Sequence, residues 1–225
     1  MKVEFDRVTK QFGELVALED ISFKISQGEF VFLTGRSGAG KSTVIRLILG
    51  EILPTKGEVW LDDCCLSQAK AKEILSFRRQ IGVVFQDFRL LNDKTLEENI
   101  LIALNVVGYR QDDWREKLIR VLKTVDLVDR ARFFPAQLSG GELQRACLAR
   151  ALIVNPKIIL ADEPTGNLDP ETSWELMSLL RKINRRGTTV IMATHNFDIV
   201  NSLRYRVIKL ESGKLIFDKK QGQYE

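Results

Sequence analysis

The 225-residue sequence has few cysteines, a single histidine and no long apolar run, and these shortages exclude several classes of protein. Its 3 cysteines include the adjacent pair Cys64 and Cys65, which is not the disulfide framework of a small secreted domain. No apolar stretch reaches the roughly 18–20 residues that a membrane-spanning helix needs. The first six residues also lack the apolar core of a signal peptide. We therefore expect a cytosolic protein, in which Cys147 is a small core residue.

Composition and charge exclude two further classes. With 44% hydrophobic residues, the chain can bury enough apolar surface to fold, and its length predicts one or two domains. The net charge of +4 is too small for a dedicated nucleic-acid binder, so no nucleic-acid partner is expected. Residues 204–220 carry six basic and two acidic residues, which alone match that net charge. We interpret this segment as a solvated surface, or alternatively as one attracted to anionic lipid.

The spacing of apolar residues predicts strands first, helices next and then an alternation of both. An N-terminal capping box at Thr95 and Glu98 begins one of the middle helices, and residues 112–125 have the apolar spacing of another. Beyond residue 157, strands alternate with helices, which implies a parallel sheet with right-handed crossovers. The predicted strands cover residues 2–7, 17–25, 29–34, 57–62, 158–161, 188–193, 206–210 and 214–218, and the later helices cover 171–186 and 197–203.

These elements predict one α/β domain over residues 1–225. It comprises a core with an N-terminal antiparallel β layer, over residues 1–86 and 156–225, and an inserted α-helical subdomain over 87–155.

A phosphate-binding loop follows the strand at residues 29–34. The sequence matches the P-loop pattern G-x-x-x-x-G-K-[ST] at every fixed position, and it opens a helix. Glycines let backbone N–H groups turn toward a phosphate, and the helix start adds its positive dipole. Lys41 can reach the β- and γ-phosphates, and the Ser42 hydroxyl can bind Mg²⁺. The predicted nucleotide-binding residues here are Gly35, Arg36, Ser37, Gly38, Ala39, Gly40, Lys41, Ser42 and Thr43.

Two carboxylates follow a second buried strand, at Asp162 and Glu163. Asp162 is expected to face Mg²⁺ at the edge of the sheet where nucleotides bind, and Glu163 to polarise the attacking water as a general base. The alternative is that both acids cap a helix, since Pro164 favours a turn.

The run Leu-Ser-Gly-Gly-Glu at residues 138–142 predicts a second helix start that can bind an anion. Ser139 is expected to cap the helix, and Gly140 and Gly141 to expose backbone amides. Two such helix starts suggest that both bind one nucleotide from opposite sides, each contributed by a different subunit.

Through this run the sequence resembles the ATP-binding-cassette (ABC) ATPases, whose signature is L-S-G-G-[EQ], over nearly its whole length. The resemblance implies a P-loop ABC ATPase core that hydrolyses ATP with Mg²⁺, and a head-to-tail homodimer that ATP closes. Two departures are Phe12 for the commoner tyrosine and Asn167 for the commoner serine. The implied site residues are Glu163, His195 and Gln86 for catalysis, Ser42, Gln86 and Asp162 for the metal, and Phe12, Ser139, Gly140, Gly141, Glu142 and Asp169 for the nucleotide.

Within the family, residues 84–91 and 161–173 and the ending Gly222-Gln223-Tyr224 resemble the cell-division cassettes. That likeness implies an integral membrane partner, a peripheral place at the cytoplasmic face of the membrane, and control of peptidoglycan hydrolysis. The groove after Gln86 is expected to receive the partner, although Phe88, Leu90 and Leu91 include core residues on the alternative interpretation. Two other functions remain open: the ATPase subunit of a lipoprotein, macrolide or other solute transporter, and a soluble ABC protein acting on DNA or ribosomes.

Overall fold

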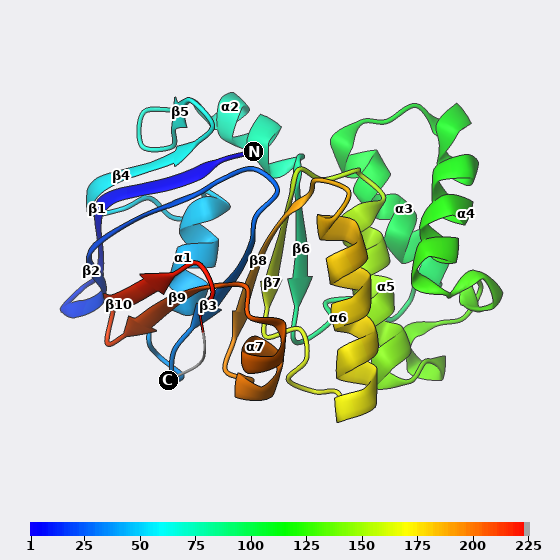
Figure 1. Ribbon diagram of the computed structural model, residues 1–225. Helices are drawn as coiled ribbons and strands as arrows, with labels where there is room; N and C mark the ends of the chain where they lie inside the picture. Colours follow the sequence, from blue (N-terminus) through cyan, green and yellow to red (C-terminus); the bar gives the residue numbers. More distant parts are fainter. Residues whose placement is uncertain (223–225) are drawn as a thin grey trace.

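The computed structural model, which describes residues 1–222, contains two β-sheets with one helix packed between them (Figure 1). The first sheet is antiparallel, with strand order β2-β1-β4-β5. Its strands are β1 (Val3–Phe12), β2 (Leu15–Ile25), β4 (Lys56–Leu61) and β5 (Cys64–Cys65), and the helix that it covers is α1 (Lys41–Ile48).

The second sheet has the order β10-β9-β3-β8-β7-β6, and its five strands from β9 to β6 are parallel. The hairpin partner β10 is antiparallel to β9. The strands are β3 (Phe30–Thr34), β6 (Ile81–Phe85), β7 (Ile158–Asp162), β8 (Thr189–Thr194), β9 (Arg206–Glu211) and β10 (Lys214–Lys219). The predicted α/β core with an N-terminal antiparallel β layer is confirmed.

Alternation of side chains along β3 divides the protein interior into two cores. Val31 and Leu33 face α1 and the antiparallel sheet, whereas Phe30 and Phe32 face the helices on the other side. Every residue of β3 is buried, as expected for a strand covered on both faces.

The helices of the second core follow β6, β7 and β8 in the sequence. Of these, α5 packs against β6 so closely that a Cβ atom at Gly82 would lie 2.8 Å from the carbonyl oxygen of Ala151. The helices α3 and α4 lie farthest from the antiparallel sheet (Figure 1). The division into a core and a helical subdomain at residues 87–155 stays a prediction. The helices are α2 (Ala71–Arg78), α3 (Leu96–Val107), α4 (Trp114–Val125), α5 (Gly140–Leu152), α6 (Pro170–Asn184) and α7 (Phe197–Leu203), with short 3-10 turns at Gln111–Asp113, Val128–Arg130 and Pro135–Gln137.

Three elements have no counterpart in the sequence prediction: β5, α2 and β6. Helix α2 has no buried residue, so it lacks the apolar stripe from which a helix is recognised. Strand β5 has only two residues, paired with Trp60 and Leu61. Strand β6 is a short apolar run, a pattern that does not distinguish a strand from a buried helical turn.

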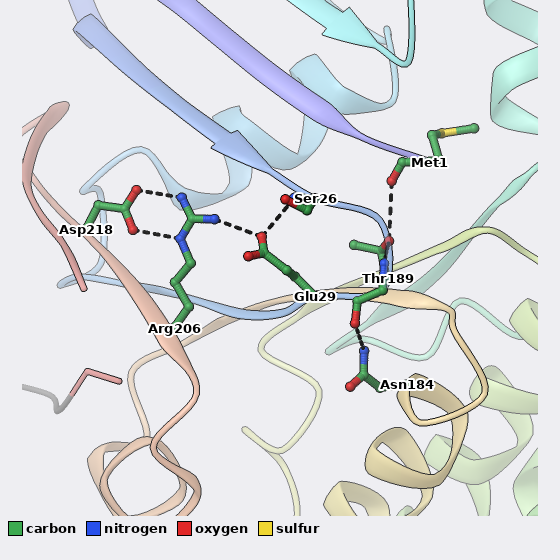
Figure 2. Close-up of polar contacts among 8 residues, drawn as sticks. Met1, Ser26, Glu29, Asn184, Thr189, Arg206 and Asp218 are labelled. Carbon is green, nitrogen blue, oxygen red and sulfur yellow. Dashed lines mark hydrogen bonds and ion pairs between the residues drawn. The ribbon is translucent and has the colours of Figure 1, made fainter. Parts of the chain in front are cut away.

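Polar contacts close the edge of the parallel sheet at which β3 and β8 begin (Figure 2). The Thr189 hydroxyl donates to the carbonyl of Met1 and accepts the N–H of Gly28. Beside it, the guanidinium of Arg206 binds Glu29 at 2.8 Å and both oxygens of Asp218 at 2.7 and 2.6 Å. These hydrogen bonds, those to Asp218 above all, raise the pKa of Arg206. One of the basic residues of the 204–220 segment is thus paired within the fold.

Two of the sequence predictions concern the end of the chain and the absence of a membrane-spanning helix. Gln223 and Tyr224, part of the ending that resembles the cell-division cassettes, lie outside them. Among the helices of residues 1–222, none combines the length and the apolar character that crossing a membrane requires.

Candidate nucleotide site

The loops that follow β3, β6, β7 and β8 surround one cavity. Parallel pairing aligns the ends of these strands, with Thr34 opposite Thr194, and Asp162 opposite both Phe85 and Ala193. Ligands of open parallel sheets bind at this carboxyl edge. The cavity has a volume of ≈ 1130 Å³, and the predicted site residues that line it are Phe12, Arg36, Ser37, Gly38, Ala39, Gly40, Lys41, Ser42, Thr43, Gln86, Asp162, Glu163 and His195.

The P-loop bends in a way that only glycine permits at two positions. Gly35 and Gly40 have φ angles of +146° and +104°. A Cβ atom would lie 2.3 Å from the carbonyl oxygen of Leu210 at the first position and 2.6 Å from the side chain of Leu18 at the second. Gly40 is also the N-cap of α1, and no acidic residue lies in the first turn of that helix. The first turn of the helix therefore contributes its N–H groups and positive dipole to the cavity without an acidic residue of its own.

Lys41 lies under the loop with only 7% of its surface exposed. Its ammonium donates to the carbonyls of Gly35 at 2.7 Å and Arg36 at 3.2 Å, and it lies 3.4 Å from Oε1 of Glu163. The loop carbonyls hold the charge at the cavity, where a phosphate oxygen is a stronger partner than a neutral carbonyl.

Asp162 ends β7 beside the P-loop helix. Burial raises the pKa of its carboxyl group, and the nearby charge of Glu163 adds to this, whereas a hydrogen bond from the Ser42 hydroxyl lowers it. A carboxylate that is buried next to another carboxylate is stabilised by a cation. Ser42, Asp162 and Gln86 offer only oxygen ligands of the kind Mg²⁺ prefers, so the donor set fits that ion.

Asp162 is the last residue of β7, and Glu163 is the first residue after it. Its φ angle is +48°, an uncommon conformation for a residue with a side chain. Its N–H still donates to Ala193 at 2.9 Å, which continues the sheet. This turn places the carboxylate against His195 at the end of β8, where Oε2 lies 2.9 Å from Nδ1. The alternative that Asp162 and Glu163 cap a helix is wrong, because the N-cap of the next helix is Asp169.

The loop after β6 contains the predicted catalytic residue Gln86. Its side-chain amide donates to the Asn167 side chain, from the loop after β7, and its backbone carbonyl accepts from the same side chain. Farther along, Phe88 and Arg89 both have positive φ angles, of +57° and +51°. No sequence motif indicated this turn.

Three side chains of α5 hold that turn by its backbone carbonyls. Gln144 donates to the carbonyl of Phe85, Cys147 to that of Phe88, and Arg150 to those of Phe88 and Arg89. Burial raises the pKa of the Cys147 thiol to about 12, in agreement with its prediction as a core residue.

The residues that were expected to form a groove after Gln86 differ in their burial. Phe88 and Leu90 pack against the core, as the alternative interpretation had it, whereas Leu91 is exposed. Arg89 and Asp87 line the nucleotide cavity instead, with the Arg89 guanidinium 3.8 Å from the centre of the Phe85 ring. Phe197 lines it too, and no motif indicated either Arg89 or Phe197.

Phe12, one of the residues predicted to bind the nucleotide, lies at the end of β1 and is 40% exposed. Its ring lines the cavity, and the Lys10 ammonium lies 4.9 Å from the ring centre on the flank. An exposed aromatic ring that lines a cavity is suited to a flat heteroaromatic ligand.

The signature residues lie apart from this cavity. Ser139 is the N-cap of α5 and forms a capping box with Glu142. Glu142 accepts from the Ser139 N–H at 2.8 Å and from Arg130 at 2.8 Å, and these contacts lower its pKa to about 2. The Glu142 carboxylate thus stabilises the start of α5 as part of the capping box.

The two signature glycines and Asp169 also lie outside the residues that line the cavity. Gly140 is exposed, but a Cβ atom at Gly141 would lie 2.4 Å from the Thr172 methyl group, so the starts of α5 and α6 touch. Asp169 caps α6 by accepting the N–H of Thr172 at 3.0 Å. One chain therefore brings together every predicted site residue except Gly35 and this second group, which comprises Ser139, Gly140, Gly141, Glu142 and Asp169.

Comparison with known proteins agrees with this arrangement. Residues 18–166 match the family described as ABC transporter. The chain is 50% identical to the cell division ATP-binding protein FtsE of Bacillus subtilis, over 99% of this chain and 98% of the relative. It is 43% identical to FtsE of Escherichia coli K12, over 95% of this chain and 96% of the relative.

Solved structures give the same result. A dimeric ATP-binding cassette in a post-hydrolysis state, bound to ADP and Pi, superposes with a TM-score of 0.88 at 37% identity, covering 99% of this chain and 100% of the other. The cassette cbiO1 from Clostridium perfringens, part of the ABC transporter complex cbiONQ, superposes with a TM-score of 0.89 at 27% identity, covering 97% and 88%.

Proposed function

Because this chain belongs to the ABC transporter family, as an ATP-hydrolysing cassette of the cell-division type, we propose that ATP closes two copies of it into a dimer that acts on a membrane partner. The observation that carries the proposal is the separation of two anion-binding helix starts in one chain. The P-loop lines the cavity, whereas the exposed start of α5 at Ser139 and Gly140 lies outside it. A head-to-tail pair of chains completes both sites at once.

In this dimer each ATP lies between Lys41 and Ser42 of one subunit and the signature residues Ser139, Gly140 and Gly141 of the other. A dimer of such cassettes is supported by the dimeric cassette bound to ADP and Pi, at 37% identity. The γ-phosphate then joins the two halves, and its release removes the charge that holds them. Closure with the γ-phosphate and opening on its release are typical of nucleotide-dependent conformational switches.

Ser42, Asp162 and Gln86 would hold Mg²⁺ with the nucleotide. When bound, the ion neutralises charge that develops on the phosphates. The chain itself positions the reaction. Glu163 accepts the proton of the attacking water, and His195 holds the carboxylate of Glu163 in place by its backbone N–H at 3.2 Å. Lys41 stabilises the negative charge of the transferred phosphoryl group.

The membrane partner that we infer is an FtsX-like protein, and the process is the control of peptidoglycan hydrolysis during cell division. The relatives' names support this, together with the exposed Leu91 near Gln86, which offers an apolar contact to a partner helix. The chain would then lie peripherally at the cytoplasmic face of the membrane. The second candidate, the ATPase subunit of a lipoprotein, macrolide or other solute transporter, uses the same catalytic residues and a different partner. The soluble class that acts on DNA or ribosomes would bind no membrane protein.

Co-purification of the full chain from detergent extracts separates these candidates. A membrane protein with few spans and a large extracytoplasmic domain is the expected partner. Recovery of a permease with many spans would instead support the transporter, and association lost on nuclease treatment would support the soluble class. Leu91→Asp should release the expected partner, whereas Leu75→Asp, at another exposed leucine, is the matched control.

A further inference from the structure

Gln86 is exposed, yet two hydrogen bonds join it to Asn167, one donated by its side-chain amide and one accepted by its backbone carbonyl. The Nε2 atom of Gln86 lies 3.2 Å from Oδ1 of Asn167, and Nδ2 of Asn167 lies 3.1 Å from the backbone carbonyl oxygen of Gln86. The two residues are 81 positions apart in the sequence, on the loops after β6 and β7. An exposed glutamine otherwise samples several rotamers, so a specific pair of this kind restricts it.

The geometry also determines which atom of the Gln86 amide is left for a ligand. A backbone carbonyl only accepts, so the atom of Asn167 that faces it is the NH₂ group. The other Asn167 atom is then the oxygen, which needs a donor, and Gln86 supplies its NH₂ group. The Gln86 oxygen, Oε1, is consequently not used in the pair. This is the atom that a hard cation prefers.

Gly166 provides the space for this arrangement. A Cβ atom there would lie 2.9 Å from Nε2 and 3.1 Å from Cδ of Gln86, so the amide rests directly on the glycine backbone. Gly166 does not have a positive φ angle, and an alanine is therefore compatible with its backbone. Such a change would act on the Gln86 side chain and not through backbone strain.

We propose that Asn167 and Gly166 are positioning residues that hold the Gln86 amide with Oε1 directed to the divalent cation of bound ATP. The proposal rests on the proposed function, since it requires that this cavity binds ATP with such an ion. It assigns to Asn167, one of the two departures from the commoner family sequence, a role within its own subunit. The loop after β7 is thereby linked to the metal site through Gln86.

The test is an equilibrium titration of the full chain with ATP, in EDTA and then with Mn²⁺. We expect Asn167→Ala and Gly166→Ala to leave the affinity in EDTA unchanged and to reduce the gain from Mn²⁺ by roughly tenfold, as outer-shell changes do at metal sites. The electron paramagnetic resonance spectrum of bound Mn²⁺ reports the same change without hydrolysis. Asn105→Ala, at an exposed asparagine of α3, is the matched control.

A double-mutant comparison separates positioning from general structure. In a Gln86→Ala background, Asn167→Ala should cause no further loss of the Mn²⁺ gain. The same loss in both backgrounds, an equal loss in EDTA, or a full gain in either single variant would overturn the inference. So would a full Mn²⁺ gain in Gln86→Ala alone. Absence of any ATP binding by the unaltered chain would instead refute the proposed function.

Discussion

The imidazole of His195 and the carboxylate of Glu163 are in direct contact, with Nδ1 2.9 Å from Oε2. The backbone N–H of His195 donates to the same oxygen at 3.2 Å, and the other oxygen of Glu163 lies 3.4 Å from the Lys41 ammonium. Glu163 is thus held from two sides, and its positive φ angle turns the carboxylate toward β8. In the proposed function, this carboxylate is the group that accepts a proton from the attacking water.

Glu163→Gln should keep ATP binding and slow hydrolysis by roughly 10²–10⁴-fold, since an amide does not accept the proton of water. The variant should accumulate as an ATP-bound dimer, because the γ-phosphate that joins the subunits is retained. Light scattering under saturating ATP measures the mass. A chain that stays monomeric would contradict the proposed dimer, whereas unchanged turnover would contradict the role of Glu163.

Lys41→Ala should weaken ATP binding by roughly 10- to 100-fold. The reason is the loss of a charge-assisted hydrogen bond to phosphate, which contributes about 1.5–3 kcal/mol. Nucleotide titration measures the effect, and Lys72→Ala, at an exposed lysine of α2, is the control of equal charge. Equal affinities for the two variants would show that Lys41 does not reach the nucleotide.

Glu142→Gln should lower the free energy of unfolding by about 1–2 kcal/mol near pH 7, since the amide loses the charge that binds Arg130 and the Ser139 N–H. The folded pKa of Glu142 is about 2, below its ordinary value of 4.5. A lowered folded pKa stabilises the fold above pH 4.5, and this contribution disappears as the pH falls from 4.5 to 2.

Urea unfolding of both chains at several pH values tests this prediction. The difference between them should be constant above pH 5 and shrink below pH 4.5. A difference that is the same at pH 3 and pH 7 would mean that the charge of Glu142 contributes nothing.

The sequence predicted those parts of the site that short motifs encode. The P-loop, the caps at Thr95 and Ser139 and the position of His195 depend on neighbours within a few residues, and the structure has them as expected. The pair of Gln86 and Asn167 was not predictable, because it joins loops 81 residues apart that only the pairing of β6 with β7 brings together. Nor was the turn at Phe88, whose backbone conformation depends on carbonyl contacts from α5.

Charge reversal at Lys219 and Lys220 should weaken binding of the chain to vesicles that contain anionic lipid. Both residues are exposed near the end of the basic segment 204–220. Arg206 contributes little to its surface charge, because Asp218 and Glu29 pair with it. Each basic residue near an anionic surface strengthens binding by roughly fivefold, so Lys219→Glu with Lys220→Glu should cost more than tenfold. Sedimentation with vesicles measures this, and Lys72→Glu with Lys123→Glu is a control of the same net charge. If both pairs bind equally, the attraction to lipid does not come from the C-terminal segment.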